Sequence, residues 1–246
     1  MRNSSCLLLL VTAALAQPPV PPMNYQVVAD WPRVPTGWNL KETAGVAVDS
    51  YNHVYVFHRG DHPIMVFDAE GWFVRSFGDG MFDRPHSIRV DGEGNIWTAD
   101  DGSHTVLKMD RFGRVRMVFG RWRTTSDAPS TMPDGSAGGA LRGLRDEGVI
   151  RFNRPTDMAV GPNGDVFVSD GYGNSRVVKF SKDGRMLKEW GKRGSGPGEF
   201  HTPHSIVVDK QGRVYVADRE NYRIQVFDSE GNFQREWKGI GSPWGL

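Results

Sequence analysis

One pattern of short apolar runs and turns occurs four times along the chain, and it constrains the fold more than any other feature. In its clearest copy, Val and Ile recur at alternate positions over 203–208, 214–217 and 224–227, and an Asp-x-x-Gly turn joins the first two runs. Such alternation suits half-buried β-strands, and Asp-x-x-Gly favours a tight hairpin. A second turn leads to a fourth run, such as 186–190 in the preceding copy. Four short strands in a repeat of about 40 to 50 residues predict an all-β fold, a β-propeller with one blade per copy.

The copies align on an apolar anchor residue that stands three positions after a proline in every copy but the first. The five anchors are Val46, Ile88, Met158, Ile206 and Leu246. An aromatic residue follows each of the first four at the same spacing, at Tyr55, Trp97, Phe167 and Tyr215. This regularity predicts blades that start near residues 44, 86, 156, 204 and 244. We expect four complete blades, the start of a fifth, and truncation relative to the functional protein.

The residues before the repeat have a different composition. A charged start, the apolar run 6–16 and the prolines after it predict a signal peptide at 1–16, an extension at 17–40 and a propeller at 41–246. The run is short for a bilayer core of about 30 Å, and an uncleaved anchor is the alternative interpretation. Cys6, the only cysteine, lies inside it. We therefore expect a secreted or periplasmic monomer with no disulfide and no transmembrane segment after cleavage.

The charge of the chain is nearly balanced, with 30 Lys and Arg residues against 29 Asp and Glu. Nucleic-acid-binding proteins normally carry a basic excess, so we expect no nucleic-acid partner. Residues 121–150 are rich in Gly, Ser, Pro and Arg and have little apolar periodicity. They predict a surface insertion between the second and third blades.

The repeat positions that differ between copies are expected to meet on one rim. In a four-stranded meander, the innermost strand starts on the rim at which the second strand ends. Two places before the anchor the copies carry Ala44, His86, Thr156, His204 and Trp244. Thirteen places after it they carry Arg59, Asp101, Gly171 and Arg219, and the longer third loop puts Tyr172 at fourteen. Two imidazoles, two guanidiniums and a phenol should therefore converge on one channel mouth.

Each of these residues also has a structural interpretation. His86 and His204 are either hydrogen-bonding rim residues or metal ligands, and imidazole is the commonest ligand for Zn²⁺. Arg59 and Arg219 could instead form blade-to-blade salt bridges with Asp61 and Glu220. Tyr172 could be a packed aromatic in a Gly-rich loop. The sequence pattern alone leaves these alternatives open.

At these residues the chain resembles the peptidyl-α-hydroxyglycine α-amidating lyases, which are six-bladed propellers of NHL-type repeats. The matching segments are Val56–His62, Pro85–His86, Pro155–Asp157, Val166–Arg176, Pro203–Ser205 and Ala217–Asn221, and they run through all four complete blades. The NHL repeat alone is a weak functional signal because the fold hosts many binding proteins. The combination of His-Arg-Gly-Asp-His, Ser-Asp-Gly-Tyr and Ala-Asp-Arg-Glu-Asn at these positions is specific.

The resemblance implies a role for each candidate residue. His86 and His204 would be zinc ligands, Tyr172 the catalytic base, and Arg59 and Arg219 substrate-contacting residues. The backbone carbonyls of Val46 and Ile88 would help to hold a structural calcium. The family's third zinc histidine and a nearby methionine lie in the sixth blade and have no counterpart here. Gly173 stands where animal members have a disulfide cysteine.

The implied reaction suits these residue types. A peptidyl- or N-acyl-α-hydroxyglycine is a carbinolamide, and loss of its hydroxyl proton lets the C–N bond break to an amide and glyoxylate. Zinc would acidify the hydroxyl and orient the carboxylate. A phenol is a weak base near neutral pH, so Tyr172 needs a cation beside it or a metal-acidified proton to take. The guanidiniums of Arg59 and Arg219 keep their charge and match a carboxylate.

Two other functions fit the fold. One is a non-catalytic NHL propeller that binds protein or peptide through the same rim. The other is a calcium-dependent lactonase-like propeller, but that chemistry requires acidic metal ligands in the channel, where this chain has histidines. The sequence therefore favours a zinc-dependent lyase.

Overall fold

The computed structural model describes residues 25–126 and 150–246. The expected signal peptide with Cys6, and most of the insertion at 121–150, lie outside the described residues. Residues up to Asp30 form a unit separate from Trp31–Leu246, and the following account concerns the second unit.

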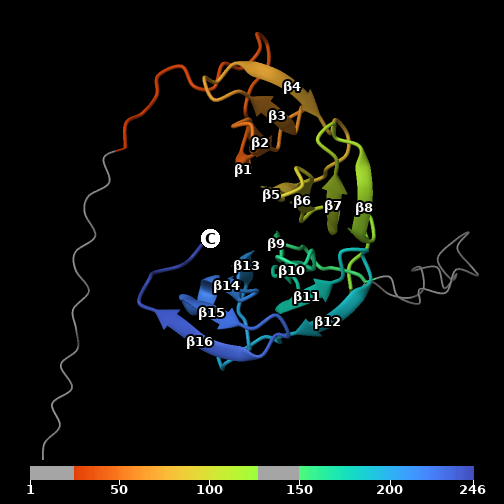
Figure 1. The fold of residues 1–246 in the computed structure, drawn as a ribbon, viewed down its shortest axis with the longest axis vertical. Helices are drawn as coiled ribbons and strands as arrows, with labels where there is room; N and C mark the ends of the chain where they lie inside the picture. The colour runs from red at the N-terminus through yellow and green to blue at the C-terminus, as the bar shows by residue number, and fades with distance from the viewer. Residues whose placement is uncertain (1–24, 127–149) are drawn as a thin grey trace, which may run out of the picture. The chain divides into compact units, whose positions relative to one another are not determined.

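The described part of this unit contains four antiparallel sheets of four strands each. The first holds β1 (Thr43–Val48), β2 (Val54–His58), β3 (Ile64–Phe67) and β4 (Phe73–Phe77); the second holds β5 (Pro85–Val90), β6 (Ile96–Asp100), β7 (Thr105–Met109) and β8 (Val115–Gly120). The third holds β9 (Asp157–Val160), β10 (Val166–Asp170), β11 (Arg176–Phe180) and β12 (Met186–Trp190); the fourth holds β13 (Pro203–Val208), β14 (Val214–Asp218), β15 (Arg223–Phe227) and β16 (Phe233–Lys238), with the 3₁₀ helix η1 (Arg219–Asn221) after β14. In each sheet the strands are paired in chain order. The sheets follow one another around an arc with β1, β5, β9 and β13 innermost (Figure 1), which is the arrangement of propeller blades.

The hairpin between the first two strands of a blade is stabilised by its aspartate. In three copies this carboxylate accepts backbone N–H groups of the turn and a side-chain donor of the second strand: Tyr55 to Asp49, Trp97 to Asp91 and Tyr215 to Asp209. In the third copy the turn starts at Gly161 instead, and the matching aromatic is Phe167, which has no polar group. The turn residue and the aromatic thus change together, because a buried polar tip needs a partner.

Neighbouring blades pack through aromatic side chains that lie on glycines. The turn glycines Gly113 and Gly231 have φ angles of 84° and 75°, and a Cβ on either would collide with Phe77 or Trp190 of the preceding blade. Between the blades lie clusters of buried Phe, Val, Ile and Met side chains. The outer face of the first blade is covered by Val34, Trp38 and Leu40. Packing between successive blades therefore holds the rim residues in register.

We expect Gly171→Ala to destabilise the contact between the third and fourth blades. A Cβ at Gly171 would lie 1.9 Å from the carbonyl oxygen of Pro203 and 2.9 Å from its carbonyl carbon, so backbone must move. Overpacking of this kind typically costs about 1 to 3 kcal/mol. Denaturant unfolding measures the loss. Gly92→Ala is the control, because nothing lies within 4 Å of its Cβ position; equal stability of the two variants would contradict the expectation.

The last residues differ from the expected opening strand of a fifth blade. No strand is assigned to 242–246, since no described segment forms a ladder with them. Instead, Ser205 Oγ accepts the N–H of Leu246, and the Trp244 carbonyl accepts from His204. These contacts place Trp244 and Leu246 beside the inner strand β13.

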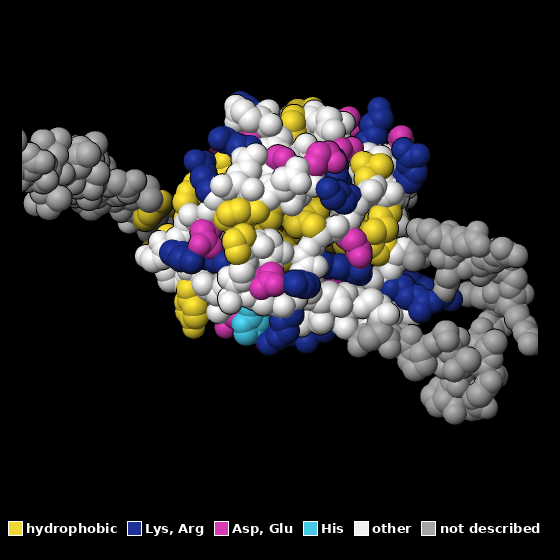
Figure 2. All heavy atoms as spheres, turned by 90° about the horizontal axis from the view of Figure 1, so that it is seen from below, with side chains coloured by type: hydrophobic (Ala, Val, Ile, Leu, Met, Phe, Trp, Pro, Cys, Tyr) yellow, Lys and Arg dark blue, Asp and Glu magenta, His cyan; other side chains and the backbone are white. Residues whose placement is uncertain are grey.

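The surface carries charges of both signs. On the face shown in Figure 2, Lys and Arg side chains are interspersed with Asp and Glu, and no large area of that face has one sign. Among the described residues, no helix has the length and apolar character needed to cross a membrane.

Candidate functional site

His86 and His204 each lie at a β-bulge in an innermost strand. In β5 the pairing passes from Pro85–Asp100 directly to Ser87–Ala99, so His86 is the extra residue. In β13 it passes from Pro203–Asp218 to Ser205–Ala217, so His204 is the extra residue. A bulge redirects a side chain out of the regular ladder. The two imidazole rings come within 4.9 Å of each other, centroid to centroid, although 118 positions separate them in the sequence.

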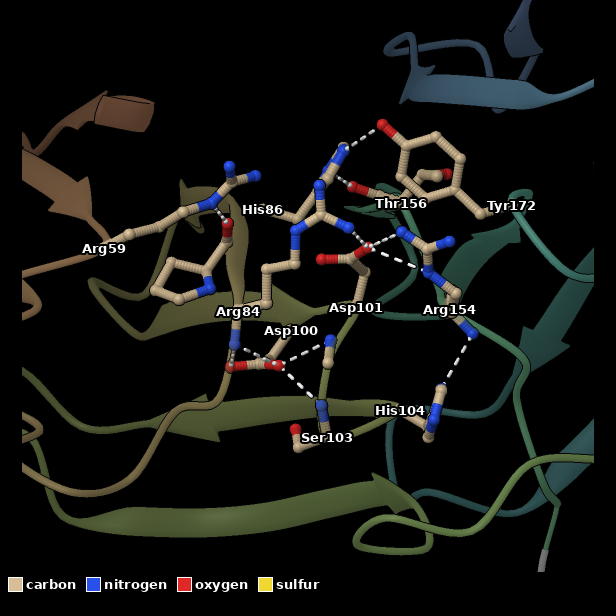
Figure 3. Close-up of polar contacts among 12 residues, drawn as sticks. Arg59, Arg84, His86, Asp100, Asp101, Ser103, His104, Arg154, Thr156 and Tyr172 are labelled. Atoms are coloured by element: carbon tan, nitrogen blue, oxygen red, sulfur yellow. Dashed lines mark hydrogen bonds and ion pairs between the residues drawn. The ribbon is translucent and has the colours of Figure 1, made fainter. Parts of the chain in front are cut away.

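The hydroxyl of Tyr172 lies between these two imidazoles. Its oxygen is 3.0 Å from Nε2 of His86 and 3.0 Å from Nε2 of His204. Tyr172 belongs to the loop between β10 and β11, so three different blades contribute to one contact. Figure 3 shows the phenol pointing at His86. The structure thus brings together the phenol and both imidazoles expected on one rim.

Backbone carbonyls fix the orientation of both imidazoles. Nδ1 of His86 lies 2.6 Å from the carbonyl oxygen of Thr156, and Nδ1 of His204 lies 2.7 Å from that of Trp244. A carbonyl only accepts, so each Nδ1 carries the proton and each Nε2 presents a lone pair to Tyr172. Thr156 and Trp244 occupy the repeat position of the histidines in the next copy. Each histidine is therefore oriented by the equivalent residue of its neighbour.

Burial disfavours the charged form of both histidines in this arrangement. Burial lowers the pKa of His204 to about 4, and burial also lowers the pKa of His86. One O–H group on Tyr172 then faces two acceptor nitrogens and can donate to only one of them. The other nitrogen faces the phenol oxygen lone pair to lone pair. A cation bound among these three atoms would satisfy the surplus lone pair.

One backbone hydrogen bond recurs at the rim and explains why the loop residues meet. The N–H groups of Arg59, Asp101, Tyr172 and Arg219 donate to the carbonyls of Glu42, Arg84, Arg154 and Thr202, in that order, at 3.1 to 3.3 Å. Each acceptor stands four places before its anchor. The bond attaches the end of the second strand to the entry of the first within each blade. Equivalent loop residues are thereby held at the same level of the rim.

Arg219 lies close to the phenol, with its guanidinium carbon 5.5 Å from the ring centre of Tyr172 and 4.2 Å from that of Trp244. It also pairs with its neighbour Glu220 at 2.8 Å, which makes this ion pair a contact within one blade and not the expected salt bridge between blades. Arg59 pairs with Glu42 at 2.7 Å rather than with Asp61, because Glu42 stands at the entry of the same blade. The Arg59 Nε also donates to the carbonyl of Pro85, next to His86.

Two residues that had no role in the sequence interpretation complete this rim. Asp101, at the repeat position of Arg59 and Arg219, is fully buried and accepts from Arg84 and Arg154. The guanidinium carbon of Arg154 lies 4.8 Å from the ring centre of Tyr172. Figure 3 shows Asp101 between the two arginines, close to His86. One sequence feature could have pointed to Arg154: it directly precedes Pro155, and Arg84 directly precedes Pro85 at the same repeat position.

Val46 and Ile88 line the same cavity of about 220 Å³ as His86 and His204. Both lie on innermost strands that pair on one side only, so their other edge faces the channel. Carbonyl oxygens are suitable ligands for Ca²⁺. The buried Asp157 also lines this cavity, and it accepts hydrogen bonds from Arg89 and Ser205.

Within residues 25–126 and 150–246, no group of three or more His, Cys, Asp or Glu side chains could by itself hold a metal ion. The donor set fits two ligands of a zinc site: two neutral, carbonyl-oriented imidazoles with convergent Nε2 atoms. A complete site needs a further ligand beyond these two. The calcium expected from the sequence would have two candidate carbonyl ligands, those of Val46 and Ile88, in the same cavity.

The fold and the rim define a class, namely a blade-repeat β-propeller with a histidine and tyrosine site at one channel mouth. The sequence model of the NHL repeat matches residues 152–180 and 200–227, which are the third and fourth blades from their entry loops to their third strands. The chain therefore contains NHL repeats in these two blades, and the resemblance drawn from its sequence is confirmed.

Its relatives include proteins named as amidating lyases and one named for its repeat. Human NHL repeat-containing protein 3 is 37% identical over 227 residues, which cover 87% of this chain and 59% of that protein. Peptidyl-glycine alpha-amidating monooxygenase A of Xenopus laevis is 35% identical over 245 residues, covering 85% of this chain and 24% of that protein. A probable peptidyl-alpha-hydroxyglycine alpha-amidating lyase of Caenorhabditis elegans is 31% identical over 223 residues, covering 78% and 58%. The chain thus spans less than two thirds of each relative.

Solved structures support the fold. A chain from a nidogen–laminin complex aligns with a TM-score of 0.61 at 12% identity, covering 84% of this chain and 68% of that chain. A streptogramin B lyase aligns with a TM-score of 0.57 at 17% identity, covering 82% and 57%. At such identities the likeness concerns the architecture alone.

Proposed function

We propose that this protein is a zinc-dependent lyase that cleaves peptidyl- or N-acyl-α-hydroxyglycines to an amide and glyoxylate. The single observation that carries the proposal is the Tyr172 hydroxyl, held 3.0 Å from two imidazole nitrogens of different blades. Relatives named as alpha-amidating lyases, at 31 and 33% identity, support the same reaction class.

The chain's own residues can carry the proton transfer and the binding of the substrate. Tyr172 acts in its deprotonated form: the phenolate oxygen takes the proton from the substrate hydroxyl, and the oxygen electrons then form the aldehyde C=O. The C–N bond breaks with its electron pair on the nitrogen, and the nitrogen takes that same proton back from Tyr172, which completes the amide and restores the phenolate. Arg219 and Arg59, whose guanidiniums flank the site, bind the glyoxylate carboxylate.

His86 and His204 would hold the zinc through their Nε2 atoms. When bound, the metal polarises the substrate hydroxyl and binds the carboxylate. We also propose a structural calcium bound partly by the carbonyls of Val46 and Ile88, beside the zinc ligands in the same cavity. A ring of six blades, export from the cell and a monomeric state remain predictions of the same proposal.

The test is release of glyoxylate from an N-acyl-α-hydroxyglycine by the full-length protein, measured with a colorimetric glyoxylate assay. We expect turnover that is abolished by a chelator and restored by added Zn²⁺, with zinc and calcium found by elemental analysis. An N-acylglycine that lacks the hydroxyl is the control substrate and should release nothing, because it has no proton for the base to take.

Absence of glyoxylate from a folded, zinc-loaded protein would reject the lyase proposal. It would favour a non-catalytic NHL propeller that binds protein or peptide through this rim. The similarity to human NHL repeat-containing protein 3, whose name states no reaction, makes this the second candidate.

A further inference from the structure

Tyr172 has little to hold its ring in place apart from the rim itself. Gly171 and Gly173 flank it, and its backbone N–H makes a long hydrogen bond of 3.3 Å to Arg154. The ring belongs to none of the buried apolar clusters of the blades. The ring contacts the imidazoles of His86 and His204 and the guanidiniums of Arg154 and Arg219. The position of the hydroxyl therefore depends on which of these neighbours are themselves fixed.

Of the two arginines beside the ring, Arg154 is the one held by a fully buried carboxylate. Its Nε and Nη2 donate to Oδ2 of Asp101 at 3.2 and 2.8 Å, and Asp101 is fully buried. Arg219 pairs with Glu220, whose side chain is 37% exposed, and lies nearer to Trp244 than to Tyr172. A buried carboxylate holds an arginine more firmly than a solvent-exposed one.

The backbone of Arg154 is also held on both sides. Its φ angle of 62° is uncommon for a residue other than glycine. Its N–H donates to Nδ1 of His104 at 3.0 Å, and its carbonyl accepts the N–H of Tyr172. Unusual backbone conformations of this kind concentrate at functional sites when the surrounding structure imposes them.

We propose that Asp101 and Arg154 are positioning residues for Tyr172. The Asp101 carboxylate holds the Arg154 guanidinium over the phenol ring, and this contact keeps the hydroxyl between the two imidazoles. The role in catalysis rests on the proposed lyase function, whereas the effect on the ring does not. Arg154 contacts the phenol ring, and Asp101 acts on the ring through Arg154. The charge of Asp101 also acts on His86, where it opposes the lowering of the pKa by burial.

Arg84 provides a matched control within the same cluster. It also pairs with Oδ2 of Asp101, at 3.2 Å, and its side chain is 46% exposed, close to the 40% of Arg154. No contact between Arg84 and the ring of Tyr172 is recorded. Arg84→Met and Arg154→Met thus each remove one ion pair to Asp101, and only Arg154→Met also removes the contact with the phenol.

In the full-length protein we expect Arg154→Met to lower kcat about 10- to 100-fold, the range that a misplacement of about 1 Å can produce. KM should stay within about twofold, because the substrate carboxylate is bound elsewhere. Arg84→Met should leave kcat within about twofold of wild type. Arg154→Lys should recover part of the loss, since an ammonium can also lie over the ring. Asp101→Asn is isosteric but removes the charge that holds Arg154, so it should also lower kcat.

Two further measurements separate positioning from general damage. In a Tyr172→Phe background, Arg154→Met should change the residual rate by less than about twofold, because a residue that acts through the phenol has nothing left to position. The ¹³Cζ NMR signal of Tyr172, assigned by its absence in Tyr172→Phe, should move in Arg154→Met and stay in place in Arg84→Met. Thermal unfolding confirms that each variant is folded.

Equal effects of Arg154→Met and Arg84→Met on kcat and on the NMR signal would overturn the proposal. So would a full effect of Arg154→Met in the Tyr172→Phe background. If the wild-type protein releases no glyoxylate, the lyase proposal fails, and the NMR comparison still decides whether Arg154 positions the ring.

Discussion

The Tyr172→Phe variant is expected to release glyoxylate about 100 to 10,000 times more slowly than wild type, the usual contribution of a positioned acid or base. The substitution removes one oxygen atom and leaves the ring contacts with Arg154 and Arg219 in place. It deletes the group that we propose takes the substrate's hydroxyl proton. The measurement is the initial rate of glyoxylate formation from an N-acyl-α-hydroxyglycine at saturating substrate.

Tyr222→Phe is the matched control for this prediction. Tyr222 is 57% exposed and follows the short helix η1, and it should tolerate loss of its hydroxyl with no change in rate. The NHL-propeller relatives with no stated reaction make the comparison informative, because a binding module would show no dependence on either hydroxyl. Full activity of Tyr172→Phe would remove the proposed base.

The second large effect is expected from the double change His86→Ala with His204→Ala. It removes both imidazoles that converge on Tyr172, so the affinity for zinc should fall by over about 100-fold. Loss of a residue that only hydrogen-bonds to a metal ligand typically costs about 10- to 100-fold, and loss of the ligands themselves should cost more. Elemental analysis after dialysis against a buffer of defined free Zn²⁺ measures this directly and does not depend on activity.

His201→Ala is the control for the metal experiment. His201 lies three positions before His204, and its ring contacts Arg193 rather than Tyr172. Its loss should leave the zinc content unchanged. A double histidine variant that retains stoichiometric zinc would show that zinc binds elsewhere in the protein.

Much of the fold could be predicted from the sequence because the repeat is local. Alternating apolar residues and turn aspartates such as Asp91 and Asp209 define each hairpin from a few neighbouring positions. The fixed count from anchor to aromatic then identifies equivalent positions in all blades. That count also predicted which residues lie on the same rim, since residues at one repeat position occupy equivalent positions in every blade.

The details of the site depended on contacts and strand registers that the repeat pattern does not specify, some within a blade and some between blades. The sequence offered Asp61 as a partner for Arg59, but the structure pairs Arg59 with Glu42, because the end of one strand meets the entry of another. The bulges at His86 and His204 are changes of register, which a pattern of residue types does not reveal. In the sequence, Asp101 and Arg154 have no feature that distinguishes them from other charged residues. Only the structure shows that Asp101 is buried and accepts hydrogen bonds from Arg154.

The sequence by itself determined the four-stranded repeat, the residue types at the rim and their family resemblance, because these depend on spacing along one chain. Only the tertiary structure decided that the Tyr172 oxygen lies 3.0 Å from two imidazoles and that a buried carboxylate supports the arginine beside it. Those distances are set by the packing of whole blades against each other, and packing between distant segments is not encoded in any single stretch of residues.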